Sequence, residues 1–212
     1  MFTLRPCEAG CGRPAISGSD LCAVHIADRN RAVSHVMTLI RQGNTAENIN
    51  ASGLDFEEED FSGCSFSGCT FKKAKFTSCT FTKTFMRMVF FDSVDFTNCK
   101  FRGCDMRYIS FAGSRFLNVV FKEMREKGYE NGKQKDRIWE CELENCNFTG
   151  AMISDCAFND ASLKYSRFIN ADFSHSVFNN CDVKMALFIE SRLEGLTFKT
   201  SNENQAVYEL ID

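Results

Sequence analysis

Four residues near the N-terminus could hold a metal ion, namely Cys7, Cys11, Cys22 and His25. Their spacing is C-x3-C-x10-C-x2-H, and two closely spaced pairs let each pair clasp one ion from a tight turn. Four nitrogen and sulfur ligands fill a tetrahedral coordination sphere, which is typical of structural zinc. Residues 1 to 25 cannot bury a core of their own, so metal binding would supply folding energy. We therefore predict a structural zinc site in a zinc knuckle over residues 1–25.

Two other interpretations of this segment stay open. The cysteines could be ordinary thiols, with His25 merely opening a helix. Residues 10–15 (GCGRPA) and 21–25 (LCAVH) also resemble small zinc knuckles attached to various microbial and phage nucleic-acid enzymes. Residues 1 to 42 carry an excess of only two positive charges, which favours a solvated basic surface over a zinc-assisted nucleic-acid binder. The cations in question are Arg5, Arg13, Arg29 and Arg31.

Other residues give no sign of an active site. His35 and His175 are isolated, and the sequence has no glycine-rich phosphate loop. A zinc ion with four protein ligands would keep no open position for a substrate. We therefore predict that the protein is not an enzyme.

Large apolar residues recur every five positions through most of the chain. Fourteen such repeats run from Phe56 to Phe121, and twelve more run from Leu143 to Phe198. A small residue stands two positions before most of them, and nine of the twelve cysteines occupy this place. Two positions in five would point inward and three outward, which requires a corner every five residues. The pattern therefore predicts a solenoid.

The repeats resemble those of the pentapeptide-repeat family, whose motif is a small residue, Asp or Asn, Leu or Phe, and two polar residues. Ala171–His175 and Cys181–Met185 match this motif closely, and the resemblance spans roughly residues 54 to 200. It implies an all-β solenoid, a right-handed quadrilateral β-helix with four repeats in each coil.

The rest of the chain divides around this solenoid. Residues 26–43 are predicted to form a capping helix with Gly43 as its stop, and residues 44–200 the β-helix. A charged loop at residues 122–138 interrupts the β-helix, and its two glycines suit a turn or a short helical hairpin. This loop is either a binding element, with Tyr129 as its best contact, or a tolerated insertion. Residues 201–212 are predicted to form a short C-terminal helix or cap, from the spacing of Val207, Leu210 and Ile211.

Some members of the resembled family protect type II topoisomerases from quinolones with an acidic, DNA-like dimeric rod. A rod of this kind should show columns of Asp and Glu at outward positions twenty residues apart. The columns instead mix both signs, which disfavours binding to DNA gyrase. They read Asp55, Lys75, Asp95 and Arg115; Glu57, Thr77, Thr97 and Leu117; and Glu144, Lys164 and Lys184.

Several outward positions are apolar, and they suggest a contact surface. If the insertion preserves the register, Met88, Tyr108, Tyr165 and Met185 share one column, interrupted by Asn145. Large exposed apolar patches usually mark interfaces, so we predict a protein-interaction scaffold that forms a homodimer or docks a protein partner. The alternative is that the insertion or local bulges cover this surface. The neighbouring apolar residues of the predicted face are Phe85, Phe90, Ile169, Leu187 and Ile189.

The sequence also bears on location. No apolar run approaches membrane-spanning length, and residues 1 to 15 lack the apolar core of a signal peptide. Reduced cysteines in repeat positions agree with this picture. We expect a cytoplasmic protein that does not contact membranes.

Overall fold

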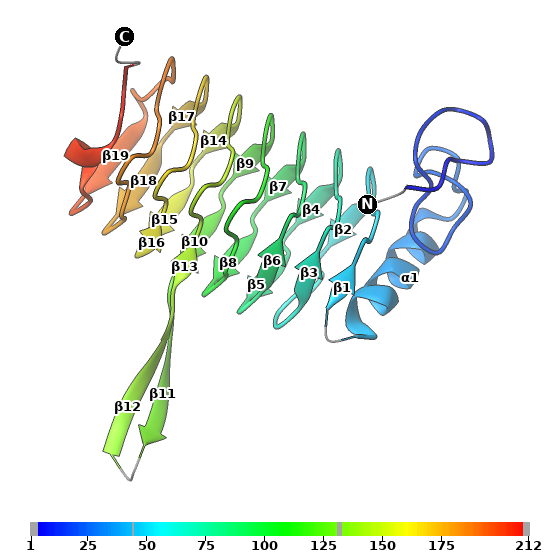
Figure 1. The fold of residues 1–212 in the computed structure, drawn as a ribbon, viewed down its shortest axis with the longest axis horizontal. Coiled ribbons are helices and arrows are strands. Elements are labelled where there is room, and N and C mark those ends of the chain that lie inside the picture. Colours follow the sequence, from blue (N-terminus) through cyan, green and yellow to red (C-terminus); the bar gives the residue numbers. More distant parts are fainter. Residues whose placement is uncertain (1–3, 44, 131–132, 210–212) are drawn as a thin grey trace.

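The computed structural model describes residues 4–43, 45–130 and 133–209. One α-helix lies at the N-terminal end of a straight solenoid, and a long hairpin projects from the side of the solenoid (Figure 1). In the described part of the chain, no helix is both long and apolar enough to cross a membrane.

Each coil of the solenoid pairs in parallel with the next, in a register of twenty residues; Phe76, for example, lies opposite Phe56 and Phe96. The predicted β-solenoid and its repeat length are therefore confirmed. Four ladders of such pairs run along the solenoid, and we number them sides 1 to 4 in chain order.

Three of the four sides contain named strands. Side 1 holds β1 (Ala46–Glu47), β3 (Ser65–Ser67), β6 (Phe85–Arg87), β13 (Cys141–Glu142) and β16 (Ala161–Ser162). Side 2 is a row of isolated bridges that runs from Asn50↔Thr70 to Leu187↔Val207. Side 3 holds β2 (Asp55–Glu57), β4 (Lys75–Thr77), β7 (Asp95–Thr97), β9 (Arg115–Leu117), β14 (Met152–Ser154) and β17 (Asp172–Ser174). Side 4 holds β5 (Thr80–Thr82), β8 (Lys100–Arg102), β10 (Val120–Lys122), β15 (Ala157–Asn159), β18 (Ser176–Asn179) and β19 (Leu196–Lys199).

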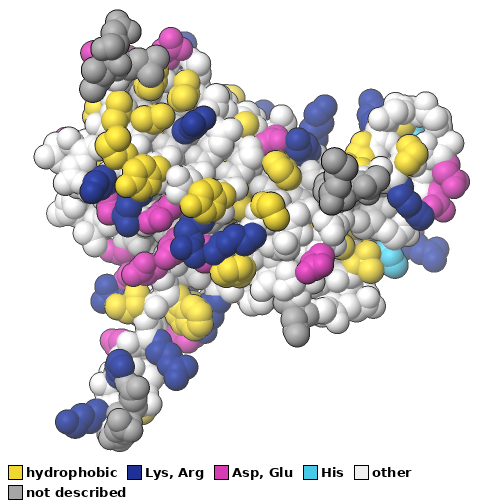
Figure 2. All heavy atoms as spheres, in the orientation of Figure 1, with side chains coloured by type: hydrophobic (Ala, Val, Ile, Leu, Met, Phe, Trp, Pro, Cys, Tyr) yellow, Lys and Arg dark blue, Asp and Glu magenta, His cyan; other side chains and the backbone are white. Residues whose placement is uncertain are grey.

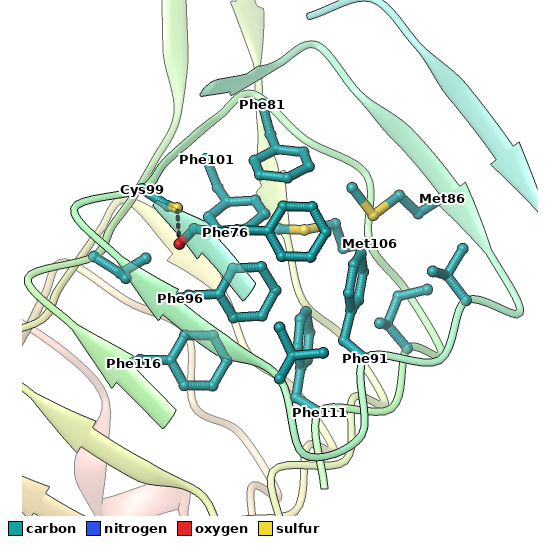
Figure 3. Packing of buried hydrophobic residues seen from close by; sticks show 14 of the residues in the cluster. Phe76, Phe81, Met86, Phe91, Phe96, Cys99, Phe101, Met106, Phe111 and Phe116 are labelled. Carbon is teal, nitrogen blue, oxygen red and sulfur yellow. Dashed lines mark hydrogen bonds between the residues drawn. The ribbon is translucent and has the colours of Figure 1, made fainter. Parts of the chain in front are cut away.

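The core consists of phenylalanine rings stacked from coil to coil (Figure 3). The ring of Phe96 stacks between Phe76 and Phe116, with centroids 5.1 Å away on both sides. The small inward residue donates a hydrogen bond to a carbonyl of the preceding coil, as Cys99 Sγ does to the Phe76 oxygen at 3.3 Å (Figure 3). Ser176 and Thr84 make the same contact through hydroxyls. This bond satisfies the polar atom of Cys, Ser or Thr at a buried position that Ala fills in other repeats, as at Ala74 and Ala151.

The corners of the coil have left-handed backbone. The residue two places after the large apolar one has a positive φ in nearly every repeat, from Asn48 at 55° to Thr200 at 50°. Glycine, Asn and Asp tolerate this conformation best, whereas larger residues are strained in it. Met88 and Tyr108 occupy such corners with φ of 52° and 64°.

The N-terminal end is covered by α1 (Arg29–Arg41), whose buried residues join the core of the first coils. The helix was expected to begin at residue 26, but it begins at Arg29 because Asp28 caps it, accepting a hydrogen bond from Arg31 N at 2.9 Å. Before the cap, the backbone N–H groups of His25 and Ile26 both bond to Cys22 O in a tight turn.

The C-terminal segment forms one 3-10 turn, η1 (Glu203–Gln205), in place of the predicted helix. The backbone of this segment pairs with the last coil of the solenoid, because Met185 N donates to Gln205 O and Phe188 N donates to Val207 O. Leu210 and Ile211 lie outside the described residues.

The insertion is a β-hairpin, so the expected short helical hairpin is wrong, while the residues that connect the two strands lie outside the described part of the chain. Strands β11 (Met124–Glu130) and β12 (Lys133–Trp139) pair antiparallel over their whole length. Lys122 still pairs with Arg102 on one side of the hairpin, and Glu142 pairs with Asp105 on the other. The coil therefore resumes where it stopped, and the insertion preserves the register of the sides.

Candidate metal centre and apolar corner

The four predicted ligands come together in one cluster. The ligand atoms of Cys7, Cys11, Cys22 and His25 all lie within 4.8 Å of one another. Cys11 and Cys22 Sγ are 3.7 Å apart, and His25 Nδ1 lies 3.4 Å from Cys7 Sγ and 3.5 Å from Cys22 Sγ. A tetrahedral zinc ion with bonds of roughly 2.0 to 2.3 Å separates its ligand atoms by about 3.5 to 3.8 Å. The residues present therefore fit a tetrahedral metal.

Local backbone geometry explains how the first pair of cysteines is presented. Pro6 and Pro14 form an antiparallel bridge, and Cys7 N donates to Arg13 O at 2.9 Å. The turn between them contains Gly10 and Gly12, whose φ values of 68° and 73° suit glycine.

Backbone N–H groups also point at the sulfur atoms. Cys22 N lies 3.3 Å from Cys7 Sγ. A backbone hydrogen bond from Arg13 lowers the pKa of Cys11, against the smaller effect of burial. Such bonds stabilise the thiolate form, which is the form that binds metals.

The knuckle is fixed to the solenoid by polar contacts. Asn50 N donates to the Ser17 hydroxyl Oγ at 2.8 Å, and Ser17 N donates to Asn50 O at 2.9 Å. Arg29 donates to Ala23 O at 2.8 Å and to Gly53 O at 2.6 Å, and it pairs with Asp55 at 3.0 Å. The metal cluster, the helix and the first coil are therefore one connected structure.

Two of the four arginines near the knuckle are already engaged with carboxylates. Arg5 pairs with Asp20 at 3.2 Å, and Arg29 pairs with Asp55. This pairing reduces the positive charge that the knuckle could offer to phosphates.

The predicted apolar column exists as one corner between sides 1 and 2, which we call the apolar corner: Met88, Tyr108, Tyr165 and Met185. Tyr108 N donates to Glu144 O, and Asn145 N donates to Lys164 O, so Asn145 stands between the two tyrosines. The four side chains are 62, 65, 50 and 46 % exposed. Figure 2 shows hydrophobic side chains following a line along the solenoid beside a band of charged ones.

The other residues of the predicted face divide into three groups. Phe85 and Phe90 flank Met88 and are exposed. Ile169 and Leu187 are half-buried. Ile189 is buried, so the prediction that it faces outward is wrong. The chain that follows Gln205 explains this, because Val207 pairs with Leu187 and extends the side 2 ladder alongside the last coil.

Sequence reasoning missed two apolar residues at the base of the hairpin. Ile138 and Trp139 are 53 and 40 % exposed, and together with Phe85 they line a hollow of about 430 Å³. Lys83 lies 5.0 Å from the Trp139 ring centroid and pairs with Glu126. The available signal was the single tryptophan of the chain, which lies next to a charged insertion. Tyr129, 75 % exposed, lies farther out on β11, opposite Gln134.

The charged columns alternate in sign where the sequence predicted it. Asp55, Lys75, Asp95 and Arg115 are neighbours in the side 3 ladder. On side 1, Asp105 bonds to Arg87 and Arg107, and Lys164 bonds to Glu144 at 2.9 Å. These columns do not form the continuous acidic surface that a DNA mimic needs.

Three deeply buried repeat thiols lack the properties of nucleophiles. Burial raises the pKa of Cys146 and of Cys156 to about 12, and that of Cys104 to about 11. At neutral pH these thiols stay protonated, as expected for packing residues.

Comparison with known proteins agrees with this fold. Residues 47–82, 138–164 and 156–195 match the family model of pentapeptide repeats, in eight copies. The matched segments lie in the solenoid and at the end of hairpin strand β12. No curated protein matches the sequence.

Solved structures resemble this solenoid at low identity. QnrB1 (M102R, trypsin-treated), a plasmid-mediated fluoroquinolone resistance protein, is 18 % identical with a TM-score of 0.50, over 77 % of this chain and 76 % of that one. Rfr23, a pentapeptide repeat protein from the cyanobacterium Cyanothece 51142, is 10 % identical with a TM-score of 0.33, over 84 % of this chain and 99 % of that one. The likeness to QnrB1 shows the fold and nothing about function.

Proposed function

We propose that this chain is a non-enzymatic, cytoplasmic scaffold that binds a protein, either a second copy or another partner, through the apolar corner and the exposed residues beside it. The observation that carries this proposal is the exposure of four large apolar side chains in one column of left-handed corners. Tyr108, Tyr165, Met88 and Met185 all have φ between 52° and 64°, where a large side chain is strained.

Long polar residues such as Glu58, Lys73 and Glu190 also occupy left-handed corners, so this column is set apart by the apolar character of its large residues. In this column the first two repeats have Asn48 and Gly68, and Asn145 interrupts the tyrosines. Large residues in an unfavourable backbone conformation are a reason to look for function. Tyrosine and methionine are also enriched in protein interfaces, where they supply contact area.

We further propose that the Cys7, Cys11, Cys22 and His25 cluster binds a structural zinc ion. The ligand distances support it, and so does the full set of four protein donors, which suits a structural site. In this arrangement zinc would hold the knuckle in the form that contacts Asn50 and places Arg29 against the first coil.

The interface proposal is tested with the double variant Met88→Arg/Tyr108→Arg. Two charges on the corner should abolish self-association in light scattering, or capture of a protein partner in pull-downs, because burying unpaired charge is costly. The control is Leu117→Arg/Met152→Arg, two residues that are 47 and 49 % exposed on side 3. Equal behaviour of wild type and both variants would show that the apolar corner is not an interface.

Two alternatives are kept for the same scaffold. Binding to DNA gyrase is the first, and a supercoiling assay with and without a quinolone separates it from the main proposal. A zinc-assisted nucleic-acid binder is the second, and it requires salt-dependent DNA binding that is lost when residues 1–25 are deleted.

A further inference from the structure

A groove of about 540 Å³ lies between the knuckle and side 2 of the solenoid, next to the metal cluster, whose ligand Cys22 is part of its lining. Its apolar lining includes Pro14 and Val24 from the knuckle and Phe90 from the solenoid. Val24 is 64 % exposed and Phe90 is 40 % exposed, so both side chains are accessible. A hollow of this size can hold one or two large side chains of a peptide.

The polar part of the lining is strongly cationic. Arg13, Arg29, Lys72 and Lys73 contribute to it, and no Asp or Glu does so among the described residues. Asp55 neutralises Arg29 at 3.0 Å, and Asp92 neutralises Lys72 at 3.0 Å. In the described part of the chain, Arg13 and Lys73 form no ion pair. The groove therefore has two cations in excess around an apolar floor.

The groove also continues into the apolar corner. Phe90 connects the two, because it lines the groove and stands two residues after Met88 of the corner. Lys72 Nζ lies 5.2 Å from the Phe90 ring centroid, so the aromatic surface ends beside a positive charge. A ligand that fills the groove can extend along the solenoid, which favours a polypeptide over a compact small molecule.

We propose that this groove binds an acidic peptide segment of the partner protein, with one large apolar side chain seated against Val24 and Phe90 and carboxylates beside Arg13 and Lys73. This inference rests on the proposed scaffold function and names the chemistry of the partner. The charge of the groove selects acidic over basic segments, and its floor selects segments with a large apolar residue.

The test uses the full zinc-loaded chain and a dye-labelled, capped peptide of sequence EDFDE in fluorescence anisotropy. Its comparison peptides are KKFKK, which reverses the charge, and EDADE, which removes the ring. We expect EDFDE to bind at least tenfold more tightly than either, with an affinity that falls as salt is raised. No binding of EDFDE, or equal binding of EDADE, would overturn the proposal.

Variants then locate the binding site. Arg13→Ala, Lys73→Asn and Val24→Glu all change exposed side chains, and Lys73→Asn lies in the solenoid, outside the knuckle. Asn also suits the backbone of Lys73, which has a φ of 59°. We expect each variant to weaken EDFDE at least fivefold. Unchanged affinity in Arg13→Ala and Lys73→Asn would place the peptide elsewhere and refute the proposal.

The same assay separates this inference from the scaffold proposal. Met88→Arg/Tyr108→Arg should lose self-association or partner capture and yet still bind EDFDE, because neither residue lines the groove. If the corner variant loses self-association or capture while wild type fails to bind EDFDE, the scaffold stands and the groove proposal falls. If EDFDE binds in the groove while the corner variant behaves like wild type, the groove is a peptide site and the corner is not the interface.

Discussion

Tyr108 and Tyr165 occupy the same corner of the solenoid on two different coils, and Asn145 occupies that corner on the coil between them. The whole hairpin separates the two tyrosines in sequence. The backbone bonds from Tyr108 N to Glu144 O at 3.0 Å and from Asn145 N to Lys164 O at 2.9 Å fix this relationship. The corner is therefore a property of the coil, and the hairpin is an addition to it.

Removal of the hairpin tests this independence. Deleting residues 124–140 joins Glu123 to Cys141, and Cys141 and Glu142 already pair with β16 and with Asp105 in the coil. We expect far-UV circular dichroism of the solenoid and its cooperative unfolding to be retained, because the ladder on both sides of the cut is unchanged. Tyr129→Ala serves as the mild comparison. An unfolded deletion variant would show that the hairpin is needed for the coil itself.

The strain at the corner predicts a gain in stability when a large residue is removed. Tyr108→Asn should raise the free energy of unfolding by about 1 kcal/mol, because Asn tolerates a positive φ better than Tyr. In a chain of this size, that corresponds to a melting temperature about 2 to 4 °C higher. The same variant should weaken self-association or partner capture.

Leu117→Asn is the matched control for this variant. Leu117 is similarly exposed at 47 %, but it lies in β9 and is not among the residues with positive φ. It should give no stabilisation. If both variants change the melting temperature alike, the effect comes from surface polarity rather than from backbone strain.

Much of this architecture could be predicted from the sequence, because each five-residue repeat encodes its own side and its own corner. Phe96 is an example of the large inward residue of a repeat, and Cys99 is an example of the small inward residue. The positive φ of Met88 and Tyr108 was not foreseen, although Gly and Asn recur at the equivalent place in other repeats. That recurrence was the signal for left-handed corners.

The parts that could not be predicted depend on contacts between distant segments. The hairpin strands β11 and β12 carry charges in both strands and no clear apolar alternation, so only their pairing reveals them. The burial of Ile189 depends on the chain after Gln205, which continues the ladder instead of forming a helix. The groove at Val24 and Phe90 exists only because the knuckle is placed against side 2.

Two carboxylates in one network on side 1 have opposite responses to pH. Burial opposes ionisation of Asp105, but hydrogen bonds from Arg87 and Arg107 outweigh it and hold its pKa at about 2. Burial, followed by the charge of Asp105, raises the pKa of Glu142. Glu142 Oε2 lies 2.9 Å from Arg107 Nε but out of hydrogen-bonding alignment.

Because the pKa of Asp105 is lower in the folded state, its ionised carboxylate stabilises the fold at any pH above the unfolded pKa of about 3.9. This stabilisation is lost as the pH falls from about 4 toward 2. We therefore expect Asp105→Asn to lower the free energy of unfolding by about 1 kcal/mol at pH 7, with the gap to wild type closing between pH 4 and pH 2. A raised carboxyl pKa has the opposite sign, so Glu142→Gln should not destabilise at pH 7. Urea unfolding at several pH values measures both, and equal losses in the two variants would contradict the assignment.

Metal removal should act on one end of the molecule only. The ligands Cys7, Cys11, Cys22 and His25 belong to the knuckle, whereas the phenylalanine core from Phe56 onward has no part in the cluster. A strong chelator, or Cys22→Ser, should therefore expose residues 4–41 to hydrogen exchange and proteolysis while the solenoid stays protected, because metal binding supplies the folding energy of so short a segment.

Cys64→Ser is the control, since Cys64 is a half-buried repeat cysteine outside the cluster. Elemental analysis should find one zinc per chain in wild type and Cys64→Ser and none in Cys22→Ser. A chelated protein whose N-terminal exchange is unchanged would mean that the knuckle folds without metal, through its contacts with Asn50 and the first coil.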